Sequence, residues 1–403
     1  MQKYVERILI QKLNSGYDVW LGNNRCGPTP EHTLLKYSDP RMWAWNIRQM
    51  GILDLPAFIS HILSRTAFPK LALIAHSQGT AQAFVALARE QRPEIGAKIS
   101  IFCALAPAVY AGRLVEAIYF KLMEFVSPAM FRLIFGIHAF IPLMMWFHSL
   151  TPGKLYGMLG YQVFSHLFKW SDERWDRGIR DRFFMFSPVY VSAESMRWWL
   201  GRECFATQKC ILATRDEEQW EDDEELREEQ MKNGHHQLHQ QAYTDEVITP
   251  AAAVAQLSRP IELQANLPSP APSTPSSDSD SDGTESPRAR AGPWYNHLFP
   301  PLALWICGSD YLVDGKRFLK RLHKGREPHV RLVHSKVIEE YEHLDVLWAI
   351  DSPEQVGREV RDVIWKVVEE EVEKAVVEGG EDEEGAWWRD LVVPSGVVTG
   401  DVC

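Results

Sequence analysis

A single serine marks the change from a strand-like to a helix-like pattern in LALIAHSQGTAQAFVALA (71–88). The apolar run LALIA before it favours a buried strand, and the Ala-rich run after it favours a helix. Ser77 stands at the junction, with Ala75 two residues before it and Gly79 two residues after it. A tight strand-to-helix turn needs small residues at both positions and lifts the serine hydroxyl out of the carboxyl edge of a sheet. The stretch therefore predicts a nucleophile elbow at Ser77.

The alternation of strands and helices continues on both sides of this stretch. It is typical of a doubly wound, mostly parallel α/β sheet. The other predicted strands are YDVWLG (17–22), KISIFCAL (98–105), PLALWIC (301–307) and VRLVHS (330–335), and the other predicted helices are Met42–Arg65, KRFLKRLH (316–323) and Leu344–Val377.

Composition and charge exclude several classes of protein. The chain has 403 residues, 45% of them hydrophobic, which is enough for one large core and excludes a wholly disordered polymer. Its net charge of −11 comes from acids concentrated in 216–229 and 369–384; outside those windows 41 basic and 35 acidic residues give +6. That balance permits contact with an anionic lipid surface. No dense basic stripe with interleaved aromatics is present, so we expect no nucleic-acid partner.

Cysteine usage and the first residues bear on the compartment. Six cysteines without paired CxxC motifs favour neither a disulfide scaffold nor a structural zinc site, although Cys204 and Cys210 are close enough for a small disulfide loop in an oxidising compartment. MQKYVERILIQKLNSG (1–16) has no apolar signal core. We therefore expect an intracellular protein.

The pattern divides the chain into five segments. Residues 1–106 and 292–377 are predicted as the two parts of the α/β core, 107–213 as an apolar helical cap, 214–291 as a disordered acidic and Ser/Pro-rich insertion, and 378–403 as a loosely held tail. The cap contains LIFGIHAFIPLMMWF (133–147), which is shorter than the roughly 20 apolar residues of a membrane span. Buried cap helices, a cap that dips into a lipid surface and a transmembrane segment all remain open, in that order of preference.

A serine nucleophile requires a histidine base and a carboxylate that orients it. In this architecture both should come after Ser77 in the chain, each just past a strand. Asp310 follows the strand 301–307 after a Gly-Ser turn, and His343 follows the strand that begins at 330. Asp314 is a rival for the acid. The amide of Gln78, at the start of the helix after Ser77, is the oxyanion donor that this chain can supply.

The remaining titratable candidates receive structural interpretations. His76 is expected to be a packing or supporting residue, and Asp345 a helix-capping or helix-dipole group. His235, His236 and His239 have metal-like spacing but fall in the predicted insertion, so we expect them to be solvated. The chemistry requires no metal and no organic cofactor.

Five blocks in family order resemble the acid lipase family, which includes gastric lipase, lysosomal acid lipase and fungal steryl ester hydrolases. They are GYDVWLGNNRCG (16–27), AHSQGT (75–80), ALAPAVY (104–110), WICGSDYLVD (305–314) and YEHLDVLWAIDSPEQV (341–356). The resemblance implies an α/β-hydrolase that cleaves triacylglycerols or steryl esters, with Ser77 as nucleophile, Asp310 as acid and His343 as base. The cap block SAESMRWWLGRECF (192–205) is more similar to the intracellular fungal branch.

The resemblance also implies what lies upstream of the first block. Family members carry further strands there and an HGLL-type loop that supplies half of the oxyanion hole, so we expect either an N-terminally incomplete gene product or a degraded hydrolase. The preferred function is a lipase or steryl esterase, located peripherally on a membrane or lipid droplet, with a hydrophobic ester lipid as substrate. The alternatives are a catalytically impaired lipid-binding remnant and a soluble esterase or thioesterase.

Overall fold

The structure of the chain, a computed structural model, describes residues 17–231 and 292–378, with gaps at 23, 26, 28, 188, 202–204, 215 and 229. It divides into two compact units, Met1–Ala213 with Pro293–Cys403, and Thr214–Gly292. In the second unit residues 216–228 are helical, which differs from the disorder expected across 214–291. Glutamate is a good helix former, and this run is rich in it. The rest of the insertion, from 232 on, and the tail from 379 on lie outside the described residues.

Four parallel strands form the sheet, in the order β1-β2-β3-β4. They are β1 (Leu71–His76), β2 (Ile99–Leu105), β3 (Leu302–Cys307) and β4 (Leu332–Ile338). The predicted strands in these four places are confirmed, although β4 begins two residues after the predicted run and ends three residues beyond it. Because all four strands run in the same direction, the residues just past their carboxyl ends meet at one edge of the sheet.

The predicted strand YDVWLG (17–22) is wrong. These residues form no strand, and Trp20 and Leu21 are 42% and 68% exposed. A strand needs a neighbour that pairs with its N–H and C=O groups, and no described strand pairs with 17–22. Tyr17 instead packs against Trp365, with its hydroxyl donating to the Arg361 carbonyl at 3.4 Å.

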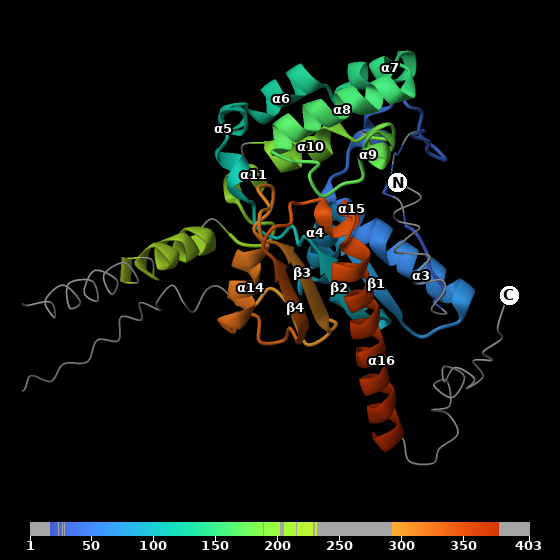
Figure 1. Cartoon of the computed structure of the whole chain (residues 1–403), viewed down its shortest axis with the longest axis vertical. Coiled ribbons are helices and arrows are strands. Elements are labelled where there is room, and N and C mark those ends of the chain that lie inside the picture. Colours follow the sequence, from blue (N-terminus) through green and yellow to red (C-terminus); the bar gives the residue numbers. More distant parts are fainter. Residues whose placement is uncertain are drawn as a thin grey trace, which may run out of the picture. The chain divides into compact units, whose positions relative to one another are not determined.

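Helices cover both faces of the sheet (Figure 1). Their bounds in the core are η1 (Pro40–Trp43), α2 (Ile47–Gln49), η2 (Met50–Asp54), α3 (Leu55–Thr66), α4 (Gln78–Leu87), η3 (Pro93–Lys98), α14 (Gly315–His323), α15 (Asp345–Trp348), η6 (Pro353–Gly357) and α16 (Arg358–Glu378). The predicted helix 42–65 therefore contains a π-helical turn, η2. The predicted helix 344–377 is interrupted after Trp348, because Ala349 adopts an extended conformation with φ −60° and ψ 145°.

Two apolar layers hold the sheet between these helices. Phe84 of α4 lies at the centre of one layer, 4.9 Å from the ring of Phe102 on β2 and 5.0 Å from the ring of Phe318 on α14. On the other face, Trp305 of β3 packs in a cluster with Ile364 of α16. Strands β2 and β3 are buried along their whole length, so they are the centre of the sheet and its outer strands are half-buried.

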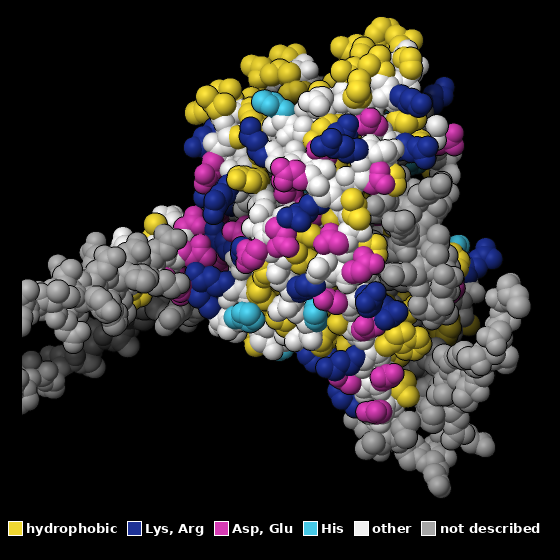
Figure 2. Space-filling model, viewed as in Figure 1, with side chains coloured by type: hydrophobic (Ala, Val, Ile, Leu, Met, Phe, Trp, Pro, Cys, Tyr) yellow, Lys and Arg dark blue, Asp and Glu magenta, His cyan; other side chains and the backbone are white. Residues whose placement is uncertain are grey.

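The cap lies on the side of the sheet where the strands end (Figure 1). It consists of η4 (Arg113–Glu116), α5 (Ile118–Glu124), α6 (Pro128–Phe135), α7 (Pro142–Leu150), α8 (Gly153–Phe168), α9 (Arg177–Phe184), α10 (Ala193–Leu200) and α11 (Phe205–Gln208). Apolar side chains gather on its outer surface over α5, α6 and α7 (Figure 2), among them Phe125, Leu133 and Leu143 at 82%, 79% and 69% exposure. Within 17–231 and 292–378, no helix has the length and apolar character needed to traverse a bilayer.

Candidate active site

Ser77 occupies the turn between β1 and α4, where its backbone has φ 52° and ψ −119°. A positive φ is costly for a residue with a Cβ atom, so the surrounding structure must hold this turn in place. Thr80 does so from within the protein core: its hydroxyl donates to the Ser77 carbonyl at 2.6 Å and accepts from the Ala108 amide at 2.9 Å. The predicted strained elbow is therefore present.

His343 brings its imidazole to the serine from the loop after β4. Its Nε2 lies 2.6 Å from Ser77 Oγ, and its Nδ1 lies 2.6 Å from Asp310 Oδ2. The His343 and Asp310 side chains are each 2% exposed. A neutral imidazole that donates from Nδ1 to the carboxylate presents Nε2 as an acceptor to the serine hydroxyl. The three side chains predicted from the sequence are thus in continuous hydrogen-bond contact.

Asp310 is fixed by the turn after β3. Its Oδ1 accepts from the backbone amides of Leu312 at 2.8 Å and Val313 at 3.2 Å, which leaves Oδ2 to face the histidine. Gly308 allows this turn to approach the loop after β4, because a Cβ atom there would lie 2.4 Å from Glu339 Cα.

The rival acid, Asp314, has a different place. It is the N-cap of α14 and accepts from the Arg317 amide at 2.9 Å. A capping carboxylate of this kind holds a helix end rather than a histidine. Of the two candidates, the structure brings only Asp310 to the imidazole.

Gln78 is the first residue of α4, directly after the serine. The first amides of a helix have no acceptor within the helix, and they carry its positive dipole end. The Gln78 amide is therefore placed to donate a hydrogen bond to an oxyanion on a carbon bound to Ser77 Oγ. Its side-chain Oε1 accepts from the indole N–H of Trp199 in cap helix α10, at 3.2 Å.

Comparisons with known proteins find lipases and a sterol esterase among the relatives of this chain. Sterol esterase 2 of Saccharomyces cerevisiae is 43% identical over 198 residues, which cover 46% of this chain and 36% of that protein. Gastric triacylglycerol lipase of Mus musculus is 27% identical over 355 residues, 86% of this chain and 71% of that protein. The chain is thus similar in sequence to lipases and to a sterol esterase. It spans only about a third of the length of the sterol esterase, so the activity of the whole relative does not transfer to it by similarity alone.

Two further comparisons add little. No family model matches this chain. An epoxide hydrolase from Vigna radiata aligns with it at 13% identity and a TM-score of 0.39, covering 91% of this chain and 88% of that chain. That likeness is too weak to support an inference about fold or function. The α/β-hydrolase arrangement rests on the parallel sheet, the elbow and the relatives.

Two further side chains contact His343: His76, which the sequence predicted as a packing or supporting residue, and Trp170, which it missed. His76 Nε2 lies 3.0 Å from the His343 carbonyl, to which it can only donate. Burial, together with the nearby His343, lowers the pKa of His76 to about 3, so its ring is neutral. Trp170, in the segment just after cap helix α8, stacks parallel to the His343 ring with centroids 6.2 Å apart. Position beside Ser77 was a signal for His76; no local pattern marks Trp170.

Asp345 was expected to serve a helix end, and it does lie in the first turn of α15. Its two carboxylate oxygens nevertheless bind elsewhere, to the Trp175 indole N–H at 2.7 Å and the Glu342 amide at 2.7 Å. Burial raises the pKa of Asp345 to about 6. The sequence signal was its spacing of two residues from His343.

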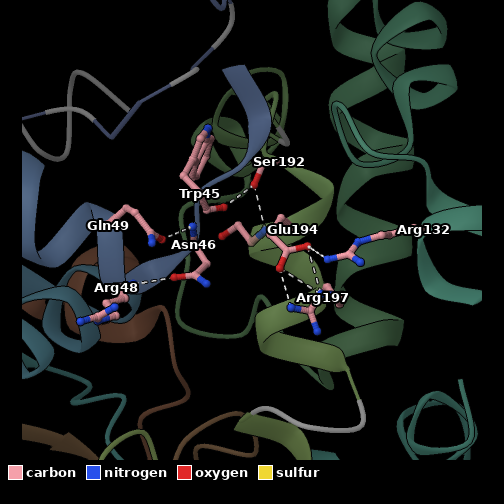
Figure 3. A network of polar contacts seen from close by, with 9 residues as sticks. Trp45, Asn46, Arg48, Gln49, Arg132, Ser192, Glu194 and Arg197 are labelled. Carbon is pink, nitrogen blue, oxygen red and sulfur yellow. Dashed lines mark hydrogen bonds and ion pairs between the residues drawn. The ribbon is translucent and has the colours of Figure 1, made fainter. Parts of the chain in front are cut away.

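A polar network fixes cap helix α10 to the core (Figure 3). Ser192, which caps α10, donates to the Trp45 carbonyl at 2.8 Å. Glu194 lies between Arg197 of the same helix, with Nε 3.0 Å from the carboxylate, and Arg132 of α6 at 3.5 Å. Arg197 in particular lowers the pKa of Glu194. The network holds α10, and with it Trp199, beside the elbow.

The remaining sequence candidates bear on metals and disulfides. Among the described residues, no three His, Cys, Asp or Glu side chains are grouped as metal ligands. His235, His236 and His239 lie outside the described residues, as does Cys204, the proposed partner of the buried Cys210.

Proposed function

We propose that this chain is a serine hydrolase that cleaves carboxylic esters of hydrophobic alcohols, of the triacylglycerol or steryl ester class. The observation that carries the proposal is the continuous contact from Ser77 Oγ through His343 to Asp310, with 2.6 Å at each step. Gastric lipase and sterol esterase among the relatives support the ester-lipid class.

In the proposed reaction His343 Nε2 takes the Ser77 proton as the oxygen attacks the ester carbonyl carbon. Asp310 holds the imidazole in the Nδ1–H tautomer and stabilises the imidazolium that forms. The tetrahedral intermediate then collapses, His343 returns the proton to the departing alcohol, and an acyl group remains on Ser77. Water repeats the same steps, with His343 again as base, and releases the carboxylic acid.

The start of α4 stabilises the negative charge of the intermediate. The Gln78 amide donates to the oxyanion, aided by the positive end of the helix dipole. Trp199 holds the Gln78 side chain from above, so the cap contacts the same residue whose amide serves the oxyanion. Burial of His343 and Asp310 keeps water from competing for these hydrogen bonds.

We further propose that the outer face of the cap docks on an anionic lipid surface, which gives access to insoluble substrates. Exposed Phe125, Leu133 and Leu143 supply apolar area. From 125 to 171 the sequence contains Lys154, Lys169 and Arg132 and no acidic residue, although Arg132 lies 3.5 Å from Glu194 of α10. Apolar area combined with positive charge is the chemistry that binds anionic membranes.

An active-site fluorophosphonate and a soluble ester, p-nitrophenyl butyrate, test the hydrolase. We expect Ser77 to be labelled and the ester to be hydrolysed by the wild type, and both to be lost in Ser77→Ala. A folded wild type that neither labels nor hydrolyses would leave the lipid-binding remnant as the better description.

Flotation with vesicles tests the lipid surface. The wild type should float with phosphatidylserine-containing vesicles and less with pure phosphatidylcholine vesicles. Replacing Phe125, Leu133 and Leu143 together by Ser should abolish flotation. The control is Leu34→Ser, because Leu34 is 88% exposed but lies outside the cap. Retention of the triple variant in the aqueous fraction together with the wild type would favour a soluble esterase.

A further inference from the structure

The loop that carries His343 receives much of its support from the cap. The cap segment 170–175, between α8 and α9, lies along residues 340–350 and is called the clasp here. Ile350 donates its amide to the Arg174 carbonyl at 2.9 Å, and Trp175 forms an antiparallel bridge with Ala349. Backbone of the cap is thus paired with the backbone that follows α15, the short helix after the histidine.

Further contacts join the clasp to the residues that precede His343 in the sequence. The Ser171 amide donates to Glu342 Oε2 at 2.6 Å. Arg174 donates from Nε to the Glu340 carbonyl at 3.2 Å, and its guanidinium lies over the Tyr341 ring at 5.9 Å. Contacts from the clasp therefore bracket His343 in sequence on both sides.

Asp345 joins the two halves of this arrangement. Oδ2 accepts from the Glu342 amide, which closes the turn around His343, and Oδ1 accepts from the Trp175 indole N–H, both at 2.7 Å. Asp345 is 2% exposed and Trp175 is 3% exposed. Removing the indole N–H would leave one buried carboxylate oxygen without that donor, which is costly enough to displace the turn.

From these contacts we infer that Trp175 and Asp345 are positioning residues for the catalytic base, so that seating of the cap sets the geometry of His343. The inference rests on the proposed hydrolase function. A cap that only covers the substrate would change binding when disturbed. A clasp that holds the base would change the rate of proton transfer to and from Ser77 as well.

The geometry makes the base sensitive to small displacements. His343 makes two hydrogen bonds of 2.6 Å in opposite directions, to Ser77 and to Asp310, and a shift of the loop cannot preserve both. A misplacement of about 1 Å can lower a catalytic rate roughly 100-fold. His76, at the end of β1, donates to the His343 carbonyl. The backbone of His343 is therefore held from the sheet by His76 and from the cap by the clasp.

Trp175→Phe tests the inference, because it removes the indole N–H and keeps an aromatic ring against Trp348, whose ring centroid is 5.0 Å away. With p-nitrophenyl butyrate we expect kcat to fall roughly 10- to 100-fold and KM to stay within about twofold. The rate of fluorophosphonate labelling of Ser77 should fall in parallel, since labelling also depends on the base.

The matched control is Trp43→Phe. Trp43 is fully buried and donates its indole N–H to the Tyr37 carbonyl at 2.8 Å, away from the loop of His343. This variant should lose stability as Trp175→Phe does, measured by urea unfolding, but keep its kcat. Equal kcat in the folded Trp175→Phe protein and the wild type would overturn the inference, as would equal losses of kcat in the two variants.

Asp345→Asn keeps the test decisive if Trp175→Phe fails to fold. The amide can replace only one of the two acceptor oxygens, so kcat should again fall while KM is kept; an unchanged kcat contradicts the inference. The activity of the wild type distinguishes failure of the proposed hydrolase from failure of the clasp. A wild type that neither labels nor hydrolyses refutes the hydrolase and the clasp together, whereas an active wild type with unaffected variants refutes the clasp alone.

Discussion

Replacing Asp310 by Asn provides a sharp test of the proposed chemistry. In the structure Oδ1 of Asp310 accepts from two backbone amides, of Leu312 and Val313, and Oδ2 faces His343 Nδ1. In Asp310→Asn the carbonyl oxygen should stay with the two amides, because an NH2 group there would face two donors. The NH2 group then points to His343 Nδ1 and donates to it.

The reversed direction of this one hydrogen bond determines how far kcat should fall. With Nδ1 as acceptor, the neutral imidazole carries its proton on Nε2 and cannot take a proton from Ser77. A serine hydrolase held in the wrong tautomer loses roughly 10⁴ in kcat. At about 1.36 kcal/mol for each factor of ten, this corresponds to about 5.4 kcal/mol in activation free energy.

Steady-state hydrolysis of p-nitrophenyl butyrate at neutral pH measures the loss, with circular dichroism to show that the variant is folded. Asp314→Asn is the matched control, because Asp314 caps α14 nearby and does not contact the histidine; its kcat should stay within about threefold of the wild type, since capping affects stability. A folded Asp310→Asn protein that keeps more than a tenth of wild-type kcat would refute the tautomer argument.

Three further perturbations concern the framework of the site. Thr80→Val should lower the free energy of unfolding by about 1 to 3 kcal/mol in urea titrations, because the Ala108 amide loses its acceptor; Thr80→Ser should not, and equal losses would contradict this. Phe84→Ala should cost about 3 to 5 kcal/mol by the same measurement, since it empties the centre of one apolar layer; a cost under about 1 kcal/mol would show that the layer collapses around the gap. His76 has a pKa lowered from 6.5 to about 3 by burial, so the unfolded chain binds a proton below pH 6.5 that the folded chain does not. Between pH 6.5 and about 3, wild-type stability should therefore fall by about 1.36 kcal/mol for each pH unit on account of this group, and His76→Asn should remove that contribution; parallel pH curves for the two proteins would exclude it.

The residues of the candidate site were accessible to sequence reasoning because each comes after a strand with a strong apolar pattern. Ser77 lies between LALIA and an Ala-rich helix, and the Gly-Ser turn places Asp310 at the end of β3. Parallel strands bring the residues past their carboxyl ends to one edge of the sheet. Knowing that 77, 310 and 343 each follow such a strand was therefore enough to predict that they lie together.

The failures have a different physical origin. YDVWLG has the composition of a buried strand, yet pairing depends on a neighbouring strand and not on the segment itself. The link between Trp175 and Asp345 joins residues 170 positions apart, across a cap whose fold no local pattern specifies. Interactions of that range become visible only when the helices of the cap are placed.

The cap and the second unit are both inserted in the sequence between β2 and β3. These two strands are nevertheless neighbours in the sheet and are hydrogen-bonded to each other. A cut anywhere between Leu105 and Leu302 would therefore leave the nucleophile on one fragment and the acid and base on the other. Neither piece could hydrolyse an ester alone, but the central seam of the sheet is the surface on which the two would reassociate. The same topology makes the chain a natural candidate for a split reporter, in which restored turnover signals that two halves have met.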